Sequence, residues 1–127
     1  MLGQHNVVPT VAVKDLVKAR EFYEDTLGLD VFMDEGELGV IYNAGTCNIL
    51  VYLSEFAGTN KATYFSFDVP ADAFDTEVAI LRSKGIKFDT FDLDDSGTWE
   101  DGVATTDNMK GVWFKDPDGN VLNVTSR

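Results

Sequence analysis

The stretch VAVKDLVKAREFYEDTLGL, residues 11–29, predicts a strand followed directly by a helix. The strand is expected from Val7 to Val13, because these residues are mostly β-branched. Asp15 can cap a helix that runs to about Thr26, and Gly28 is typical of a helix end. One face of that helix collects the apolar side chains of Leu16, Ala19, Phe22, Tyr23 and Leu27. Three extended segments are expected next, at about residues 30–33, 38–43 and 48–53.

The same signals return 57 residues further along the chain. Asp72 repeats the cap, Gly85 repeats the helix end, and Ile86 takes the place of the apolar residue that follows Gly28. Equal offsets at three positions indicate two copies of one strand–helix–strands unit. In the second copy, strands are expected at about 62–69, 86–91, 103–106, 111–115 and 121–125. Residues 92–101 form an extra acidic loop that contains Trp99, and DPDG at 116–119 predicts a tight turn.

Composition narrows the class of protein. The chain has 127 residues, enough for one domain, and its 22 Asp and Glu against 10 Lys and Arg give a formal charge of -12. This charge argues against binding to nucleic acid or to an anionic membrane, and it would attract a cationic ligand. No apolar run approaches a membrane span, and the first residues do not resemble a signal peptide, so we expect a cytoplasmic protein.

The cysteine and histidine counts exclude several kinds of chemistry. Cys47 is the only cysteine, so no disulfide can form within the chain, and we expect it to be a small buried residue. His5 is the only histidine, which excludes any mechanism that needs two imidazoles in one chain. The acidic loop from Asp92 to Gly97 has a partial calcium-loop pattern, but Val103 stands where such a loop needs glutamate. We therefore interpret it as a solvated loop.

Three motifs resemble one known family. They are VxVxDLxxAxxFY followed by LGL in residues 11–29, VxxLRxxGIxF in residues 78–88, and FxDPDGNVL in residues 114–122. Their order and spacing resemble the vicinal oxygen chelate superfamily, which includes glyoxalases, bleomycin-resistance proteins and extradiol dioxygenases. The resemblance implies an α+β fold of two βαβββ modules, with mixed sheets curled around a cavity and helices on the outer face. We expect one domain over residues 1–127, with modules at about 6–54 and 61–127, and a homodimer.

Enzymes of this family hold a divalent metal through His or Gln near the start of each module's first strand and Glu on each last strand. The matching positions in this chain are Val8, Tyr64 and Asn123, with Val51 or Tyr52 as the fourth. Valine cannot bind a metal, and neutral tyrosine and asparagine are poor ligands for zinc, iron or nickel. We therefore expect no metal, no cofactor and no catalytic residue, and we expect His5 to be solvated.

Strand alternation predicts which side chains face the cavity. Val7, Val11, Val13, Phe65, Phe67, Val69, Leu122 and Val124 would pack toward the helices, and the opposite set would line a pocket. Trp99 and Trp113 could stack on a planar or cationic ligand. The predicted ligand-binding residues are Val8, Thr10, Tyr64, Ser66, Trp99, Trp113, Asn123 and Thr125. The same residues could instead line a solvent-filled groove or a dimer interface.

These observations favour a metal-free, dimeric protein of the bleomycin-resistance type that encloses a cationic or aromatic small molecule. Whether it is an enzyme stays open, with the missing ligand types favouring a non-enzyme. One alternative is a glyoxalase-like, metal-dependent lyase, isomerase or dioxygenase with unorthodox ligands. A second is metal-free acid–base catalysis through Tyr64 or an acidic residue. A third is a regulatory or interaction module without a ligand.

Overall fold

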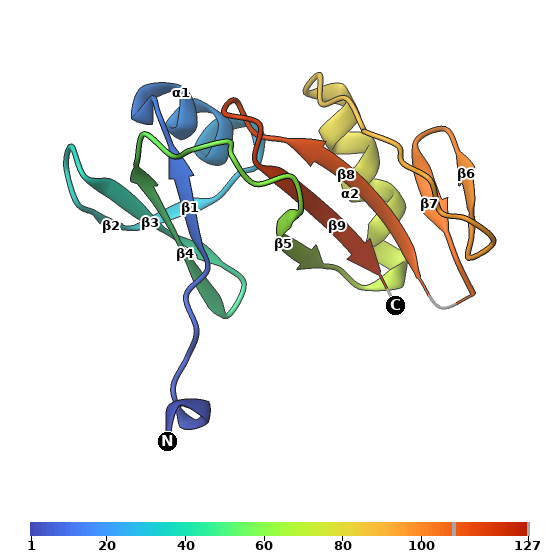
Figure 1. Cartoon of the computed structure of the whole chain (residues 1–127), viewed down its shortest axis with the longest axis horizontal. Coiled ribbons are helices and arrows are strands. Elements are labelled where there is room, and N and C mark those ends of the chain that lie inside the picture. The colour runs from blue at the N-terminus through green and yellow to red at the C-terminus, as the bar shows by residue number, and fades with distance from the viewer. Residues whose placement is uncertain (108, 127) are drawn as a thin grey trace. The chain divides into compact units, whose positions relative to one another are not determined.

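The computed structural model describes residues 1–107 and 109–126, and it contains two β-sheets, each with its own helix (Figure 1). Asn108 and Arg127, which fall within the second predicted module, lie outside the described residues. The chain divides into two compact units. Unit 1 comprises Met1–Lys61 and Pro117–Asn120, and unit 2 comprises Ala62–Asp116 and Val121–Arg127. The α+β fold with two mixed sheets is the predicted one.

Unit 1 holds a four-stranded sheet in the order β1-β4-β3-β2. The first strand runs parallel to the last, and the other neighbours are antiparallel. A 3₁₀ turn, η1 (Leu2–Gln4), precedes the sheet. The strands and helices are β1 (Thr10–Val13), α1 (Leu16–Arg20), η2 (Glu21–Thr26), β2 (Asp30–Asp34), β3 (Gly39–Ala44) and β4 (Cys47–Leu53).

The first helix begins as predicted but changes its winding. The Asp15 carboxylate accepts a hydrogen bond from the backbone N–H of Lys18 at 3.1 Å, which is the expected N-cap contact. After Arg20 the backbone continues to Thr26 as a π-helix, a rare form that is frequent at functional sites. Gly28 then adopts φ +72°, a left-handed conformation that ends the helix.

The apolar face of this helix covers one side of the four-stranded sheet. Tyr23 stacks on Tyr42 of β3, with ring centroids 6.0 Å apart. The core of unit 1 is completed by fully buried side chains from the strands, namely Val11, Val13, Val40 and Val51. Val7 was expected in this core, and that prediction is wrong, because β1 begins only at Thr10 and Val7 is 84% exposed. Cys47, expected to be buried, is exposed at the start of β4.

Unit 2 repeats the arrangement and adds one strand. Its sheet has the order β5-β9-β8-β7-β6, and again the first strand is parallel to the last. The elements are β5 (Thr63–Asp68), α2 (Ala71–Ser83), β6 (Thr98–Glu100), β7 (Val103–Thr105), β8 (Lys110–Lys115) and β9 (Val121–Ser126). The predicted internal repeat is therefore confirmed at the level of strand order.

Three local predictions for unit 2 are wrong. Residues 86–91 do not form a strand, and only Asp89 makes an isolated bridge, to Trp113. Trp99 does not lie in a loop, because the acidic insertion closes into the β6–β7 hairpin. Helix α2 begins at Ala71 after Pro70, so Asp72 lies in its first turn rather than at the cap. Proline fits this start because its missing N–H would have no helical partner.

Helix α2 lies against β9 and buries one apolar stripe (Figure 1). The stripe consists of Phe74, Val78 and Leu81, at the helical spacing of four and three. The facing strands contribute four buried side chains, Val112, Phe114, Leu122 and Val124. Phe65 and Phe67 of β5, also expected in this core, contact each other edge-to-face but remain half-buried.

The tight turn after β8 belongs to unit 1. The buried Asn120 amide donates a hydrogen bond to the Ala12 carbonyl at 2.8 Å, and Asp118 accepts one from the Lys14 backbone N–H at 3.1 Å. Gly58 also approaches this turn closely, because a Cβ built on it would clash with the Asp118 carbonyl oxygen. Residues more than one hundred positions apart are thereby joined within one unit.

Within residues 1–107 and 109–126, none of the helices has the length and apolarity that a membrane crossing requires.

Candidate functional site

The helix-free face of the unit 2 sheet carries the polar and aromatic side chains of its strands. Register pairs Trp113 with Asn123, Ser66 with Asn123, and Gly111 with Thr125, so these residues share one face. The opposite face holds the apolar residues that pack toward α2. Six of the predicted binding residues thus lie in unit 2, and four of them, Ser66, Trp113, Asn123 and Thr125, are on adjoining strands.

Three aromatic rings meet on this sheet. Phe91, from the segment before the acidic loop, contacts both Trp99 of β6 and Trp113 of β8, with centroids 5.3 and 4.9 Å apart. Trp99 and Trp113 lie 6.0 Å apart. The interplanar angles are 85°, 85° and 71°, so the three planes are nearly perpendicular to one another. We call these three residues the aromatic cluster.

Hydrogen bonds fix both indoles of the aromatic cluster. Trp99 Nε1 donates to the Phe91 carbonyl oxygen at 2.8 Å, and Trp113 Nε1 donates to Thr63 Oγ1 at 3.2 Å. The Trp indoles are half-buried, whereas Phe91 is 48% exposed. Hydrogen bonds therefore hold both indoles in place, and Phe91 is the member of the cluster that is most accessible to solvent.

Asn123 and Thr125 are buried and hydrogen-bonded to the sheet itself. Asn123 Nδ2 donates to the carbonyls of Val112 and Val124 at 3.0 and 3.3 Å. Thr125 Oγ1 donates to the Lys110 carbonyl at 3.2 Å. Because their donors are used internally, these two predicted binding residues position the strands under the aromatic cluster rather than offering free donors to a guest.

The remaining predicted residues are exposed or half-buried. Ser66 is exposed on β5, and Tyr64 is half-buried beside a register shift between Thr63 and Phe65. Val8 is 45% exposed before β1, and Thr10 is exposed at its first position. These last two belong to unit 1, and they stay predicted binding residues.

Sequence reasoning missed Phe91 as a member of the site. It predicted residues 86–91 as a plain strand, in which Phe91 would have been one more sheet residue. The only signal in the sequence was an aromatic residue directly before the acidic insertion that carries Trp99. That signal cannot say which rings meet, because the meeting depends on how the β6–β7 hairpin folds back on β8.

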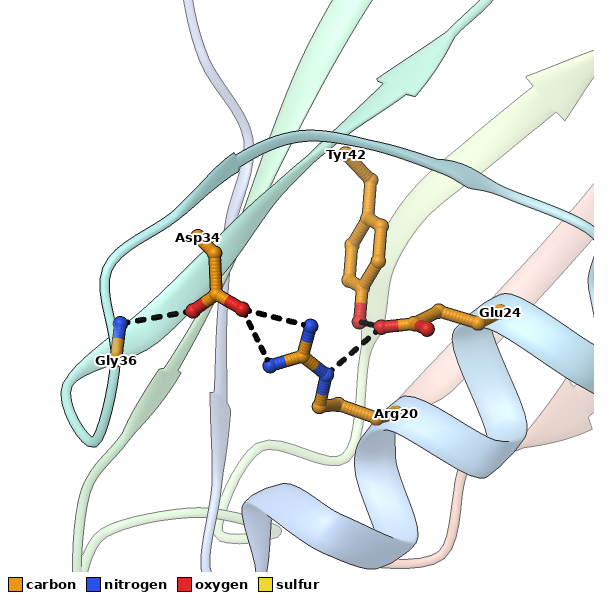
Figure 2. A network of polar contacts seen from close by, with 5 residues as sticks. All are labelled: Arg20, Glu24, Asp34, Gly36 and Tyr42. Carbon is orange, nitrogen blue, oxygen red and sulfur yellow. Dashed lines mark hydrogen bonds and ion pairs between the residues drawn. The ribbon is translucent and has the colours of Figure 1, made fainter.

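A second polar cluster lies in unit 1, around the start of the π-helix (Figure 2). Arg20 donates through Nε to Glu24 and through both terminal nitrogens to Asp34, each at 2.9 Å. The hydroxyl of buried Tyr42 donates to the same Glu24 oxygen at 2.9 Å. Asp34 also accepts the backbone N–H of Gly36 at 2.8 Å. We call these residues the Arg20 network.

The Arg20 network shifts three pKa values. Burial, followed by the hydrogen bond to Glu24, raises the pKa of Tyr42 well above its usual range. The Gly36 N–H and then Arg20 hold the pKa of Asp34 below its ordinary value. The hydrogen bond to Asp34 is the largest factor that raises the pKa of Arg20. All three shifts favour the protonation states that these groups have at neutral pH, as expected for paired charges and a buried hydroxyl.

Shallow hollows elsewhere on the surface offer less chemistry than the aromatic cluster. One, in unit 1, lies beside Leu16, Val17 and Leu53 and includes Arg20 and Asp34, whose charges are already paired. Another, also in unit 1, is lined by Lys14, Leu53, Ser54 and Glu55. A third, in unit 2, follows the acidic loop and is lined by Asp95, Ser96, Gly97, Thr98, Thr105, Thr106 and Asp107. In none of them do aromatic rings and satisfied polar groups converge as they do around Trp113.

A sequence model of the glyoxalase/bleomycin resistance protein/dioxygenase superfamily matches residues 4–124, nearly the whole chain. The chain belongs to this superfamily. No curated protein matches it significantly.

Several solved structures share the fold of this chain. A putative glyoxalase family protein from Bacillus anthracis has a TM-score of 0.69 and 18% identity, over 97% of this chain and 96% of that one. A glyoxalase family protein from Enterococcus faecalis has a TM-score of 0.70 and 16% identity, over 98% and 99%. A mutant of the fosfomycin resistance protein FosX from Listeria monocytogenes has a TM-score of 0.68 and 15% identity, over 94% and 87%. That FosX structure is a complex with Mn(II) and dihydroxypropylphosphonic acid.

The positions that the sequence analysis matched to metal ligands of the superfamily do not suit a divalent metal in this chain. Asn123 points its amide nitrogen at two backbone carbonyls, and the carbon side chain of Val8 has no donor atom. Of the two candidates on β4, Val51 is buried on the helix side, whereas Tyr52 is 36% exposed and lies on the other face. Across residues 1–107 and 109–126, no group of three or more His, Cys, Asp and Glu residues could hold a metal ion. His5 is exposed.

Proposed function

We propose that this protein binds a cationic or aromatic small molecule without a metal, as a relative of the bleomycin-resistance branch of its superfamily. The observation that carries the proposal is the aromatic cluster. Trp99 and Trp113, both expected from the sequence to contact a ligand, come together with Phe91 on the helix-free face of one sheet. Such a surface gives affinity through ring contacts and does not need a catalytic group.

The polar residues of the same face support binding rather than catalysis. Asn123 and Thr125 give their side-chain donors to backbone carbonyls, so they stiffen the sheet beneath the aromatic cluster. The exposed hydroxyl of Ser66, one strand away from Asn123, remains to orient a polar group of the guest. In this arrangement the aromatic rings supply affinity and the Ser66 hydroxyl supplies orientation, a division that is common in small-molecule sites.

The proposal includes a homodimer. The helix-free face of each sheet is rich in side chains that are only partly covered, and a second copy of the chain would cover part of that surface. Analytical ultracentrifugation tests this part independently of any ligand. A dimer at micromolar concentration is expected, and a monomer throughout the concentration range would contradict the dimer but not the ligand site.

Calorimetric titration with a panel of cationic drugs and small aromatic molecules tests ligand binding. We expect at least one saturable interaction, accompanied by a change in tryptophan fluorescence, because the only two tryptophans of the chain are in the aromatic cluster. The variant Trp99→Leu should lose that interaction while keeping its circular dichroism spectrum. An absence of binding across the panel at millimolar ligand would contradict the proposal.

A further inference from the structure

We infer that the aromatic cluster recognises an alkylated ammonium group, quaternary or N-methylated, in preference to a planar aromatic ring. The inference rests on the proposed ligand-binding function and narrows the class of ligand. Three independent features of the described residues lead to it. They are the angles between the rings, the engagement of both indole N–H groups, and the charge of the surrounding segment.

The ring angles disfavour a flat guest. A planar ring binds best when it stacks, offset, on a parallel partner or enters a slot between two parallel rings. In the aromatic cluster the smallest angle between two planes is 71°, so the three rings offer no parallel pair. Nearly perpendicular planes present their π faces in different directions, which matches a compact, roughly spherical group.

The ring distances permit one cation to contact several rings. A cation is attracted by an aromatic face when it lies within about 6 Å of the ring centroid. Because the three centroids are separated by 4.9, 5.3 and 6.0 Å, one cationic centre can satisfy this limit for more than one of the rings. Phe91, the most exposed member, is the side from which the guest would enter.

Both indole N–H groups already donate within the protein, so the cluster has no indole donor for a neutral or anionic acceptor group of a ligand. Trp99 Nε1 donates to the Phe91 carbonyl, and Trp113 Nε1 donates to Thr63 Oγ1. The cluster therefore interacts through its π electrons, which attract positive charge and repel negative charge. An alkylated ammonium has few or no N–H groups of its own that would be left unsatisfied against such a surface.

The charge around the cluster has the complementary sign. Between Lys87 and Lys110 the chain carries seven acidic residues and no Lys or Arg. Two of the seven are balanced, since Asp89 pairs with Lys115 and Asp101 pairs with Arg82. The segment that contributes Phe91 and Trp99 therefore keeps a negative field, which raises the local concentration of cations.

The decisive probe is choline against its uncharged carbon isostere, dimethylbutanol, which has the same shape without the charge. Tryptophan fluorescence is the readout, because both tryptophans of the chain belong to the cluster. We expect saturable binding of choline, and binding of the isostere weaker by roughly tenfold or more, since several rings contribute. Indole serves as the planar comparison and is expected to bind more weakly than choline.

Two further measurements separate a cation–π contact from simple packing. Growth on fluorinated tryptophan replaces only Trp99 and Trp113, and it should weaken choline binding stepwise with each added fluorine, because fluorine withdraws electron density from the ring. Phe91→Leu should weaken it by about threefold to thirtyfold. Phe56→Leu, the same change at an aromatic residue of unit 1 that is 69% exposed, should leave it unchanged.

The outcomes distinguish this inference from the proposed function. If the isostere or indole binds as tightly as choline, the preference for an alkylated cation is wrong and the ligand-binding function stands. If fluorination has no effect on choline affinity, the contact is not cation–π and the inference is again overturned. If neither choline nor any member of the wider panel binds, both fail.

Discussion

Gly111 of β8 lies directly beneath the indole of Trp113, two residues along the same strand. A Cβ at Gly111 would be 3.0 Å from Trp113 Cη2 and 3.1 Å from Cζ3, and 3.4 Å from the Asn123 amide nitrogen. The six-membered ring of the indole thus lies against Gly111, which has no side chain to displace it. This contact sets the position of the central ring of the aromatic cluster.

Gly111→Ala should therefore displace the Trp113 ring rather than unfold the protein. A Cβ contact at 3.0 Å requires the indole to move by a few tenths of an ångström, which strains its hydrogen bond to Thr63. We expect a shift of the tryptophan emission maximum and weaker ligand binding, with a loss of stability of about 1–3 kcal/mol. Gly3→Ala, where no atom lies within 4 Å of the added Cβ, is the matched control. Unchanged emission and affinity in Gly111→Ala would show that the indole is not held there.

Tyr42→Phe tests the Arg20 network. The substitution removes the hydroxyl that donates to Glu24 from a fully buried ring. Glu24 keeps its contact with Arg20, so we expect a loss of only about 1 kcal/mol in the free energy of unfolding at neutral pH, measured by urea denaturation. Tyr52→Phe, at a partly exposed tyrosine, should change stability by less than about 0.5 kcal/mol.

We also predict that the stability difference between wild type and Tyr42→Phe depends on pH. The pKa of Tyr42 is raised in the folded state, so its stabilising contribution is complete below about pH 10, where the unfolded tyrosine is still protonated. Above that pH the unfolded state releases its proton first, and the contribution declines. The stability difference between wild type and Tyr42→Phe should consequently shrink as pH rises above 10. A difference that grows with pH would contradict the raised pKa.

Asn123→Glu tests whether the superfamily's carboxylate can be restored. A buried carboxylate cannot donate to the Val112 and Val124 carbonyls, so we expect a loss of about 3 kcal/mol or more and a lower Tm. Millimolar MnCl2 should not reverse that loss, because no second carboxylate or imidazole is available at the matching positions. Asn6→Glu, at an exposed residue, controls for the added charge. Stabilisation of Asn123→Glu by the metal would show that a usable set of ligands exists.

Asn120→Ala tests the turn that joins distant parts of unit 1. The amide of Asn120 is fully buried and donates to the Ala12 carbonyl at 2.8 Å. Removing it leaves that carbonyl without its donor, and we expect a loss of about 1–3 kcal/mol in urea denaturation. Asn6→Ala, at an exposed asparagine, should be close to neutral. An Asn120→Ala protein as stable as wild type would mean that the contact contributes nothing to unit 1.

Local signals in the sequence were enough to predict the repeated architecture. Asp15 caps its helix with its own side chain, and Gly28 and Gly85 end theirs at positive φ, all through interactions within a few residues. Each signal acts within its own segment. The 57-residue repeat of these signals therefore corresponds to two sheets in which the first strand lies beside the last. The limits of these signals show at Asp72, where Pro70 begins the helix instead, and at Val7, which lies outside any strand.

The sequence by itself determined the fold class and the superfamily, and it singled out Trp99 and Trp113 as candidate binding residues. Only the tertiary structure decided that Phe91 joins them, that Asn123 gives its amide to the backbone, and that Arg20 links Glu24 to Asp34. Capping and alternation are properties of neighbouring residues, whereas ring contacts and buried hydrogen bonds depend on the register between strands that are distant in the chain. That register is fixed by packing between strands, so no short segment of the sequence predicts it.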